Sequence, residues 1–220
     1  MKEIITDDGS ITFFNDEFKD IYHSKTGAIE ESMKKYAIPS VEYLLEKNNI
    51  KEIEEIKILD ICFGLGYNSC AIIDLIKEKF NNVKIKIIAL EIDNLIIDKI
   101  NKLNPDFKNY EIIKKLAIDK EYDDGKIFIK LLIGDAFKTI DLVDFKVDLV
   151  FHDPFSPSKQ FLLWNEDFFL KVLEKMVNSG RLFTYSCSRK VRNNLINVGF
   201  NVIDGPIVKR KSPSTIAIKG

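Results

Sequence analysis

Three apolar runs constrain the fold most, because each one ends in a glycine turn or a carboxylate. Residues 58–61 lead to Gly64-Leu65-Gly66, residues 86–90 end at Glu91, and residues 130–133 precede Gly134 and Asp135. Such runs are typical of buried parallel strands, which all end at one edge of a sheet. Glycines there admit a ligand against the backbone, and carboxylates accept from ribose hydroxyls or an adenine amine. The sequence thus predicts a nucleoside pocket of the S-adenosylmethionine type.

From residue 56 onward, predicted strands alternate with predicted helices. We expect strands at 56–61, 84–90, 127–133, 147–152, 181–186, 200–204 and 214–218. We expect helices over 68–80, 94–119, 136–143, 166–177 and 188–197. This alternation implies right-handed crossovers and an α/β fold: a doubly wound, mostly parallel, Rossmann-like sheet of seven strands, the last two forming a pair.

The first 50 residues differ from this pattern and predict a small lid. Asp7-Asp8-Gly9-Ser10 reads as a hairpin turn in which Gly9 supplies a positive φ. A helix through Glu31 and Tyr36 is expected to be interrupted by Pro39, and a further helix should run from Val41 to Asn48. We expect one domain over residues 1–220, with the lid at 1–50 and the cofactor-binding core at 51–220.

Composition excludes several classes of protein. With 220 residues, of which 45% are hydrophobic, the chain can bury an α/β core without disulfides. Its three cysteines, Cys62, Cys70 and Cys187, form no paired motif and are expected to be reduced. No apolar run approaches the roughly 18 residues of a membrane span, so we expect a cytoplasmic protein. A net charge of −1 argues against extensive nucleic-acid binding but permits a local basic patch.

The glycine turn alone leaves the cofactor open. Gly64-Leu65-Gly66 could equally begin a dinucleotide fold, in which Glu91 would also hold ribose hydroxyls. Asp135 and the segment 152–157 favour S-adenosylmethionine, because enzymes using it place adenine and the methyl acceptor at those two strand ends. The alternative is that Glu91 and Asp135 are solvated carboxylates without a ligand.

The segment Asp153-Pro154-Phe155-Ser156-Pro157 suggests how a methyl acceptor is held. A carboxylate on a loop stiffened by two prolines can bind an amine while the aromatic ring stacks on a base. A protonated amine is no nucleophile, so transfer requires a proton acceptor, and Asp153 is the candidate. Alternatively, Asp153 caps the following turn and Phe155 is core. His152 lies on the opposite side of its strand and is expected to be buried rather than catalytic.

These segments together resemble the methyltransferase part of the bacterial MnmC family, which completes 5-methylaminomethyl-uridine at the tRNA wobble position. The resemblance rests on Tyr22-His23-Ser24, Glu30-Glu31-Ser32, Phe63-Gly64-Leu65-Gly66-Tyr67-Asn68, Asp153-Pro154-Phe155-Ser156-Pro157-Ser158-Lys159, Trp164, Thr184-Tyr185-Ser186, Val191-Arg192, Gly199-Phe200 and Lys209-Arg210. It implies a class I S-adenosylmethionine-dependent methyltransferase that N-methylates 5-aminomethyl-(2-thio)uridine at position 34. It also implies a monomer without metal that binds the anticodon region of tRNA, while a separate enzyme supplies the aminomethyl precursor.

The resemblance further assigns roles to individual residues. Asp153 would be catalytic. The cofactor would be bound by Tyr22, Glu31, Gly64, Gly66, Asn68, Glu91, Asp135 and Ala136. The substrate would be bound by Phe155, Lys159, Trp164, Arg192, Lys209 and Arg210. The basic clusters Arg189-Lys190 and Lys209-Arg210-Lys211 are the candidate phosphate contacts, and the second is preferred.

The chain departs from the family pattern in three places. Cys62 replaces a glycine, which requires a negative φ at this position; Gln160-Phe161 replaces Asn-Pro; and Ser212-Pro213 replaces Glu-Met. The FAD-dependent oxidase half of the fused protein is also absent from these 220 residues.

Three other functions remain open at this point. An aminopropyltransferase of the spermidine synthase type shares the acidic strand ends but carries an acid in its first turn, which this chain lacks. A methyltransferase for a ring amine would use Asp-Pro-Pro-Tyr, and the second proline is missing here. A non-catalytic tRNA-binding module would be expected to have a degraded pocket.

Overall fold

The computed structural model of the chain describes residues 1–47 and 53–220, which contain a mixed sheet of eight strands. The order of the strands is β10-β11-β9-β8-β4-β5-β7-β6. Their bounds are β4 Glu55–Ile61, β5 Lys84–Glu91, β6 Glu121–Asp123, β7 Ile127–Ile133, β8 Val147–His152, β9 Met176–Thr184, β10 Phe200–Asp204 and β11 Thr215–Lys219. Strands β9, β8, β4, β5 and β7 run parallel, whereas β11 and β6 are antiparallel to their neighbours. The predicted doubly wound α/β fold is confirmed.

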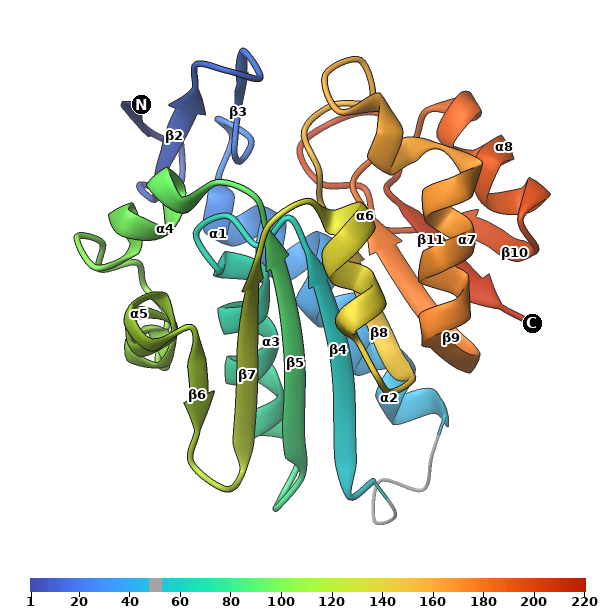
Figure 1. Cartoon of the computed structure of the whole chain (residues 1–220), viewed down its shortest axis with the longest axis horizontal. Helices are drawn as coiled ribbons and strands as arrows, with labels where there is room; N and C mark the ends of the chain where they lie inside the picture. The colour runs from blue at the N-terminus through green and yellow to red at the C-terminus, as the bar shows by residue number, and fades with distance from the viewer. Residues whose placement is uncertain (48–52) are drawn as a thin grey trace.

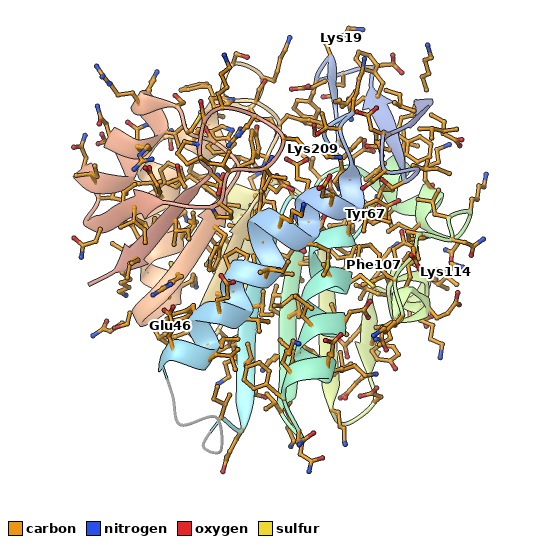
Figure 2. All side chains as sticks on the ribbon, turned by 180° about the vertical axis from the view of Figure 1, so that it is seen from behind. Lys19, Glu46, Tyr67, Phe107, Lys114 and Lys209 are labelled. Atoms are coloured by element: carbon orange, nitrogen blue, oxygen red, sulfur yellow. The ribbon has the colours of Figure 1, made fainter. Side chains whose placement is uncertain are left out.

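Helices cover both faces of this sheet, because its central strands are apolar on both sides. In β4, Ile58 packs into one hydrophobic cluster and its neighbour Leu59 into the other. The first cluster lies beneath α2 Ile38–Lys47, α3 Tyr67–Lys79, α4 Asn94–Ile100 and α5 Tyr110–Asp119. The second lies beneath α6 Ala136–Thr139, α7 Glu166–Lys175 and α8 Arg189–Asn197. Figure 1 shows α6 and α7 in front of the sheet, and Figure 2 shows α2 and α3 from behind.

A small N-terminal sheet lies at the edge where the parallel strands end (Figure 1). It consists of β1 Lys2–Ile5, β2 Ile11–Asn15 and β3 Asp20–Ile21, paired antiparallel. The predicted hairpin turn is confirmed: Gly9 has a φ of 80°, and its N–H donates to the carbonyl oxygen of Thr6 at 2.9 Å. This hairpin brings the residues that follow it over the edge of the main sheet.

The predicted helix break at Pro39 is wrong. The short helix α1, Ala28–Glu31, continues as a π-helix, η1 Ser32–Ala37, which joins α2 without a gap. The N–H of Ile38 donates to the carbonyl of Met33, five residues earlier, and this wider turn directly precedes the proline. Proline clashes with the tighter turn of an α-helix, so the widened backbone accommodates it. The expected helix end at Asn48 lies outside the described residues.

Some predicted boundaries also differ from the structure. β6 is an additional edge strand of only three residues, too short to produce an apolar pattern. The helix expected over 166–177 ends at Lys175, and β9 begins at Met176 rather than at residue 181. Its first half is irregular, because the pairing with β8 shifts register and Ser179 has a φ of 62°. The helical stretches expected over 94–119 are α4 and α5, whereas the helix expected over 136–143 is divided into α6 and the 3₁₀ turn η3 Ile140–Leu142.

The N-terminal segment packs into the same hydrophobic cluster as the core. Phe13 of β2 and Val41 and Leu44 of α2 share this cluster with Ile72 of α3. The proposed division into a lid and a core stays a prediction, and its boundary between residues 50 and 51 lies outside the described residues. Within residues 1–47 and 53–220, each helix is too short or too polar to cross a membrane.

The turn between β4 and α3 requires glycine at position 66. Gly66 has a φ of 73°, and a Cβ atom there would lie 2.6 Å from both Phe63 Cζ and Ile113 Cγ2. Gly125, in the turn before β7, has a similar φ of 82° but no atom within 4 Å of a Cβ position. The two glycines therefore share a backbone conformation and differ in available space.

We expect Gly66→Ala to destabilise the protein more than Gly125→Ala. In both variants the left-handed backbone lowers the free energy of unfolding by about 1–2 kcal/mol. In Gly66→Ala, overpacking against Phe63 and Ile113 lowers it by roughly 1–3 kcal/mol more. Urea unfolding of the two variants measures the difference. Equal losses would contradict the proposed close packing of the turn against Phe63 and Ile113.

Candidate active site

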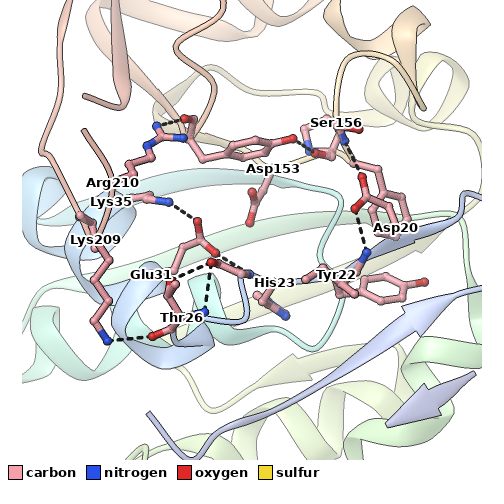
Figure 3. Close-up of a pocket in the computed structure, with 16 residues that line it drawn as sticks. Asp20, Tyr22, His23, Thr26, Glu31, Lys35, Asp153, Ser156, Lys209 and Arg210 are labelled. Atoms are coloured by element: carbon pink, nitrogen blue, oxygen red, sulfur yellow. Dashed lines mark hydrogen bonds and ion pairs between the residues drawn. The ribbon is translucent and has the colours of Figure 1, made fainter. Parts of the chain in front are cut away.

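Three adjoining cavities follow the edge where the parallel strands end. The first, of about 340 Å³, lies between the ends of β5 and β7 and a loop that follows β8. The second, of about 270 Å³, lies between the N-terminal segment, Asp153 and the connection from β10 to β11 (Figure 3). A narrow cavity of about 20 Å³ shares Cys62 and Glu91 with the first and Tyr22 and Asp153 with the second. We call these the nucleoside, acceptor and connecting cavities.

The glycine turn forms one wall of the connecting cavity. Gly64 has a φ of 56°, and a Cβ atom there would lie 3.4 Å from the ring of Tyr22. The expectation of a negative φ at Cys62 is wrong, since its φ is 66°. Leu90 holds this conformation, because its carbonyl accepts from Cys62 N at 2.9 Å and from Phe63 N at 3.0 Å. A non-glycine residue in this conformation carries a strain of about 1–2 kcal/mol.

Glu91, at the end of β5, joins this turn to its own strand. One carboxylate oxygen accepts from Gly64 N at 2.8 Å, and the other accepts from Ile92 N at 2.8 Å and Asp93 N at 2.9 Å. Burial raises the pKa of Glu91 to about 7, although the three amide donors lower it. Glu91 is thus both a structural acceptor and a group that faces the nucleoside cavity.

Asp135 stands at the mouth of the nucleoside cavity. Its Oδ1 accepts from Phe137 N at 3.0 Å and caps α6, while the side chain remains exposed. Ala136 is buried and also lines the cavity, together with apolar side chains such as Ile92 and Leu163. A flat apolar slot with an acid at its entrance suits a purine whose amine needs an acceptor.

Asp153 lies where the connecting and acceptor cavities meet. Its carboxylate accepts from Tyr36 Oη at 2.6 Å and from Asn68 Nδ2 at 2.9 Å, while Asn68 Oδ1 is buried without a partner in the described residues. Burial, followed by the charge of Glu31, raises the pKa of Asp153 to about 6. Tyr36 belongs to the π-helix, so the N-terminal segment positions the carboxylate.

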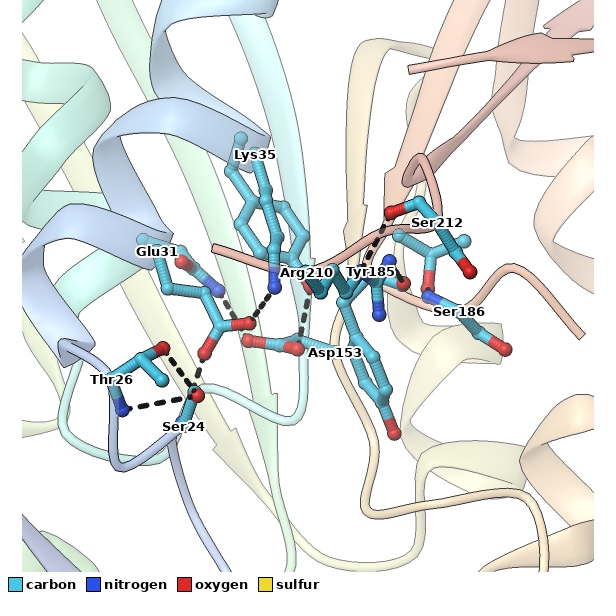
Figure 4. A network of polar contacts seen from close by, with 12 residues as sticks. Ser24, Thr26, Glu31, Lys35, Asp153, Tyr185, Ser186, Arg210 and Ser212 are labelled. Atoms are coloured by element: carbon cyan, nitrogen blue, oxygen red, sulfur yellow. Dashed lines mark hydrogen bonds and ion pairs between the residues drawn. The ribbon is translucent and has the colours of Figure 1, made fainter. Parts of the chain in front are cut away.

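Glu31 and Lys35 form a buried ion pair beside Asp153 (Figure 4). Glu31 also accepts from Ser24 N at 3.0 Å, which ties the pair to the loop after β3. The hydroxyl of Tyr22 donates to Asp93 at 2.6 Å, while Tyr22 lines the connecting cavity.

Aromatic rings cover the connecting cavity. The ring of Phe155 lies 5.1 Å from Phe18 and 4.9 Å from Tyr22, between centroids. Trp164 is buried, and its Nε1 donates to the carbonyl of Phe155 at 2.8 Å. Trp164 therefore holds the backbone of the loop that carries Phe155. Lys159, on the same loop, is exposed and lines the nucleoside cavity.

The basic residues assigned to the substrate make contacts within the protein. Arg192 pairs with Asp204 of β10. Lys209 pairs with Glu30 and donates to the carbonyl of Thr26 at 2.8 Å. Arg210 donates to the carbonyls of Tyr185, Ser212 and Pro213. Lys209 and Arg210 line the acceptor cavity, while Arg192 lies outside all three cavities.

Three further residues were not predicted as part of the site. In the sequence, Tyr36 is only one of the apolar residues of a predicted helix. Its hydrogen bond to Asp153 joins residues 117 positions apart in the sequence. Asp60, in β4, is fully buried, accepts from Ser69 Oγ at 2.6 Å, and burial raises its pKa to about 7. His23 lines the acceptor and connecting cavities, and burial lowers its pKa to about 4. The strand-end position of Asp60 was the available signal.

His152 is buried, as predicted. Its ring lies edge-on to Trp164 at 4.7 Å, and burial lowers its pKa to about 3. The three cysteines are free thiols, also as predicted.

The sheet order, the glycine turn and the acids at the strand ends define the class I methyltransferase fold. The chain belongs to the S-adenosyl-L-methionine-dependent methyltransferase family, whose sequence model matches residues 97–220. This confirms the resemblance inferred from the sequence. It also decides between S-adenosylmethionine and the dinucleotide that the glycine turn alone left open.

Individual proteins that resemble this chain in sequence or structure support the same assignment. The chain is similar to MNMC2 from Aquifex aeolicus, whose crystal structure matches with a TM-score of 0.82 and 36% identity over 98% of this chain and 69% of that one. It is 32% identical to an uncharacterized protein of Methanocaldococcus jannaschii, over 97% of this chain and 58% of that protein.

It is also 28% identical to the tRNA 5-methylaminomethyl-2-thiouridine biosynthesis bifunctional protein MnmC of Campylobacter hominis, over 88% of this chain. The chain spans only 29% of the length of that protein.

The residues present fit S-adenosylmethionine. Glu91, Asp153 and Glu31 line the cavities, and the pKa values of Glu91 and Asp153 are raised. Asp60, which interacts electrostatically with Glu91 and Asp153, is buried outside the cavity linings. Lys35 forms an ion pair with one of these acids, Glu31. A cavity with this excess of acid suits a ligand that carries a sulfonium and an ammonium. The turn at Gly64 leaves room for it against the backbone.

We expect the ligand-free protein to lose stability as the pH rises from about 6.5 to about 8. Glu91 and Asp60 have folded pKa values of about 7, above those of the unfolded chain, so the folded state binds more protons in this window. This stabilisation is complete at low pH and is lost as the pH rises through about 7. The loss should be on the order of 1 kcal/mol by chemical denaturation.

Asp60→Asn provides the control, because its amide oxygen still accepts from Ser69 and no longer titrates. It should make the pH-dependent loss clearly smaller. The histidines act in the opposite direction: His23 and His152 have folded pKa values of about 4 and about 3, below the unfolded value of about 6.5, so deprotonation of the unfolded chain offsets part of the loss. A stability that is constant or rises between the two pH values would contradict the assignment.

Proposed function

We propose that this protein transfers a methyl group from S-adenosylmethionine to the amine of 5-aminomethyl-(2-thio)uridine at wobble position 34 of tRNA. The observation that carries the proposal is the half-buried carboxylate of Asp153, which Tyr36 and Asn68 hold where the connecting cavity meets the acceptor cavity. The family membership and the names of the MnmC relatives support the substrate class.

In this proposal the nucleoside cavity holds the adenosine part of the cofactor. Glu91 takes the ribose hydroxyls, Asp135 the adenine amine, and the cavity wall at Ala136 the face of the purine. Gly64 and Gly66 shape the turn beneath it, while Tyr22, Glu31 and Asn68 surround the opposite end. When bound, S-adenosylmethionine supplies an electrophilic methyl group on a sulfonium.

Asp153 prepares the substrate amine for this transfer. The amine arrives protonated, and a carboxylate beside it both attracts the cation and accepts its proton. The pKa of Asp153, raised to about 6, lies close to physiological pH, which suits a proton acceptor better than an ordinary aspartate. Tyr36 and Asn68 fix the carboxylate, so its orientation costs little when the substrate binds.

Phe155 completes the acceptor side. Its ring, packed against Phe18 and Tyr22, covers the connecting cavity and excludes water. We propose that the exposed part of this ring contacts the uracil and that Lys159 approaches the backbone of the RNA. Trp164 acts as a positioning residue, because it holds the carbonyl of Phe155.

Asp135→Asn tests the adenine contact without disturbing the fold. Asparagine caps a helix as well as aspartate does, so α6 and the melting temperature should be preserved. The amide cannot replace the free carboxylate oxygen, so cofactor affinity should fall about 10- to 150-fold, the effect of a charged hydrogen bond of about 1.5–3 kcal/mol. Calorimetric titration measures the cofactor affinity.

Asp144→Asn, which changes an exposed acid outside the nucleoside cavity, is the charge-matched control. Unchanged affinity in Asp135→Asn would remove the assignment.

The function itself is tested by identifying the product. Incubation with labelled S-adenosylmethionine and bulk tRNA from cells lacking the modification should place the label in 5-methylaminomethyl-(2-thio)uridine. Asp153→Asn should bind the cofactor within a few fold of wild type but lower the rate about 10²-fold or more. Label in another nucleoside, or a normal single-turnover rate in Asp153→Asn, would overturn the proposal.

The pH profile separates proton acceptance from a structural role. The wild-type rate should rise with pH through about 6, as Asp153 ionises. Tyr36→Phe removes a hydrogen bond that lowers this pKa, so the rise should move to higher pH. A rise that stays in place in Tyr36→Phe would mean that another group titrates.

A further inference from the structure

A short turn beside the nucleoside cavity presents apolar side chains to solvent. This is the 3₁₀ turn η4, Phe161–Trp164. Leu163 and Trp164 are buried, whereas Phe161 is 59% exposed and Leu162 54% exposed. The turn therefore buries its last two side chains and exposes its first two.

The turn is rigidly connected to the loop that carries Asp153. The side chain of Gln160 accepts from Phe155 N at 2.8 Å, and Trp164 Nε1 donates to the Phe155 carbonyl at 2.8 Å. Leu163 N donates to the Gln160 carbonyl at 3.1 Å. These bonds hold the backbone of η4 against the loop that follows Asp153.

Phe161 separates the nucleoside cavity from a fourth cavity of about 350 Å³, which we call the outer cavity. The outer cavity lies between η4 and the first turns of α7 and α8. Glu166 and Asp167 line one side of it, and Lys190 lines the other. Its acidic side disfavours phosphate but not the uncharged face of a nucleobase.

Two cations flank the exposed ring without internal partners. Lys159 lines the nucleoside cavity and Lys190 the outer cavity, and both are exposed. Within residues 1–47 and 53–220, neither ammonium forms an ion pair or hydrogen bond, whereas Lys209 and Arg210 are both engaged. On the connection between β10 and β11, Lys211 is exposed as well, but Lys209 and Arg210 are engaged, so two unengaged cations lie beside Phe161.

We propose that Phe161 is a stacking platform for an unpaired nucleobase adjacent to the target nucleoside, with Lys159 and Lys190 facing the flanking phosphates. The inference rests on the proposed function, because it assumes an RNA substrate. Exposed aromatic rings bind single-stranded RNA by stacking, and nearby lysines bind its backbone.

The test compares the affinity and salt dependence of RNA binding. The probe is an unmodified tRNA transcript, titrated by fluorescence over a salt series. Phe161→Ala should weaken binding about 5- to 100-fold without changing the slope of log K against log salt, because stacking releases no counterions. Phe161→Trp should restore binding. Lys190→Ala should weaken binding and flatten the slope by about 0.7–0.9.

Two controls separate stacking on Phe161 from a general loss of surface apolar area and from a damaged cofactor site. Ile118→Ala removes a side chain that is 66% exposed and lines none of the four cavities, and it should bind RNA like wild type. Because Phe161 also lines the nucleoside cavity, calorimetric titration with S-adenosylmethionine is run on Phe161→Ala in parallel, and the loss of RNA affinity, measured without cofactor, should exceed any change in cofactor affinity.

Wild-type RNA affinity in Phe161→Ala would overturn the inference, as would a loss confined to cofactor affinity. Wild-type protein that neither binds nor methylates tRNA would instead overturn the proposed function.

Discussion

The site depends on the burial of more carboxylates than the protein neutralises with its own cations. Glu91, Asp60 and Asp153 lie at or near the ends of parallel strands, where burial raises their pKa values. Backbone amides, a serine, a tyrosine and an asparagine stabilise them by hydrogen bonds instead. This arrangement suits a cationic ligand, and it is the reason that we expect the same group of acids to affect both stability and binding.

The N-terminal segment is part of this arrangement. Its π-helix supplies Tyr36 to Asp153 and Lys35 to the ion pair with Glu31, the last residue of α1. The widened turn that accommodates Pro39 is therefore the same element that carries these side chains. A π-helix is rare and is often found at functional sites, which agrees with its position here.

Positive charge is distributed between internal and external roles. Lys209 and Arg210 connect the segment between β10 and β11 to the N-terminal helix and to backbone carbonyls, so they close one side of the acceptor cavity. Lys159 and Lys190 remain available at the surface on either side of Phe161. The protein can thus bind a polyanion locally while its net charge is −1.

The sequence by itself determined the alternation of strands and helices and the acids at the strand ends, because hydrophobic period and glycine turns are local properties. It also determined the family, through Gly64-Leu65-Gly66 and the Asp153 loop. Only the tertiary structure decided that Cys62 adopts a positive φ, since the carbonyl of Leu90 on a neighbouring strand holds it there. The tertiary structure likewise placed Tyr36 on Asp153 and engaged Lys209 internally, because these contacts join residues 117 and 183 positions apart, beyond the reach of any local pattern.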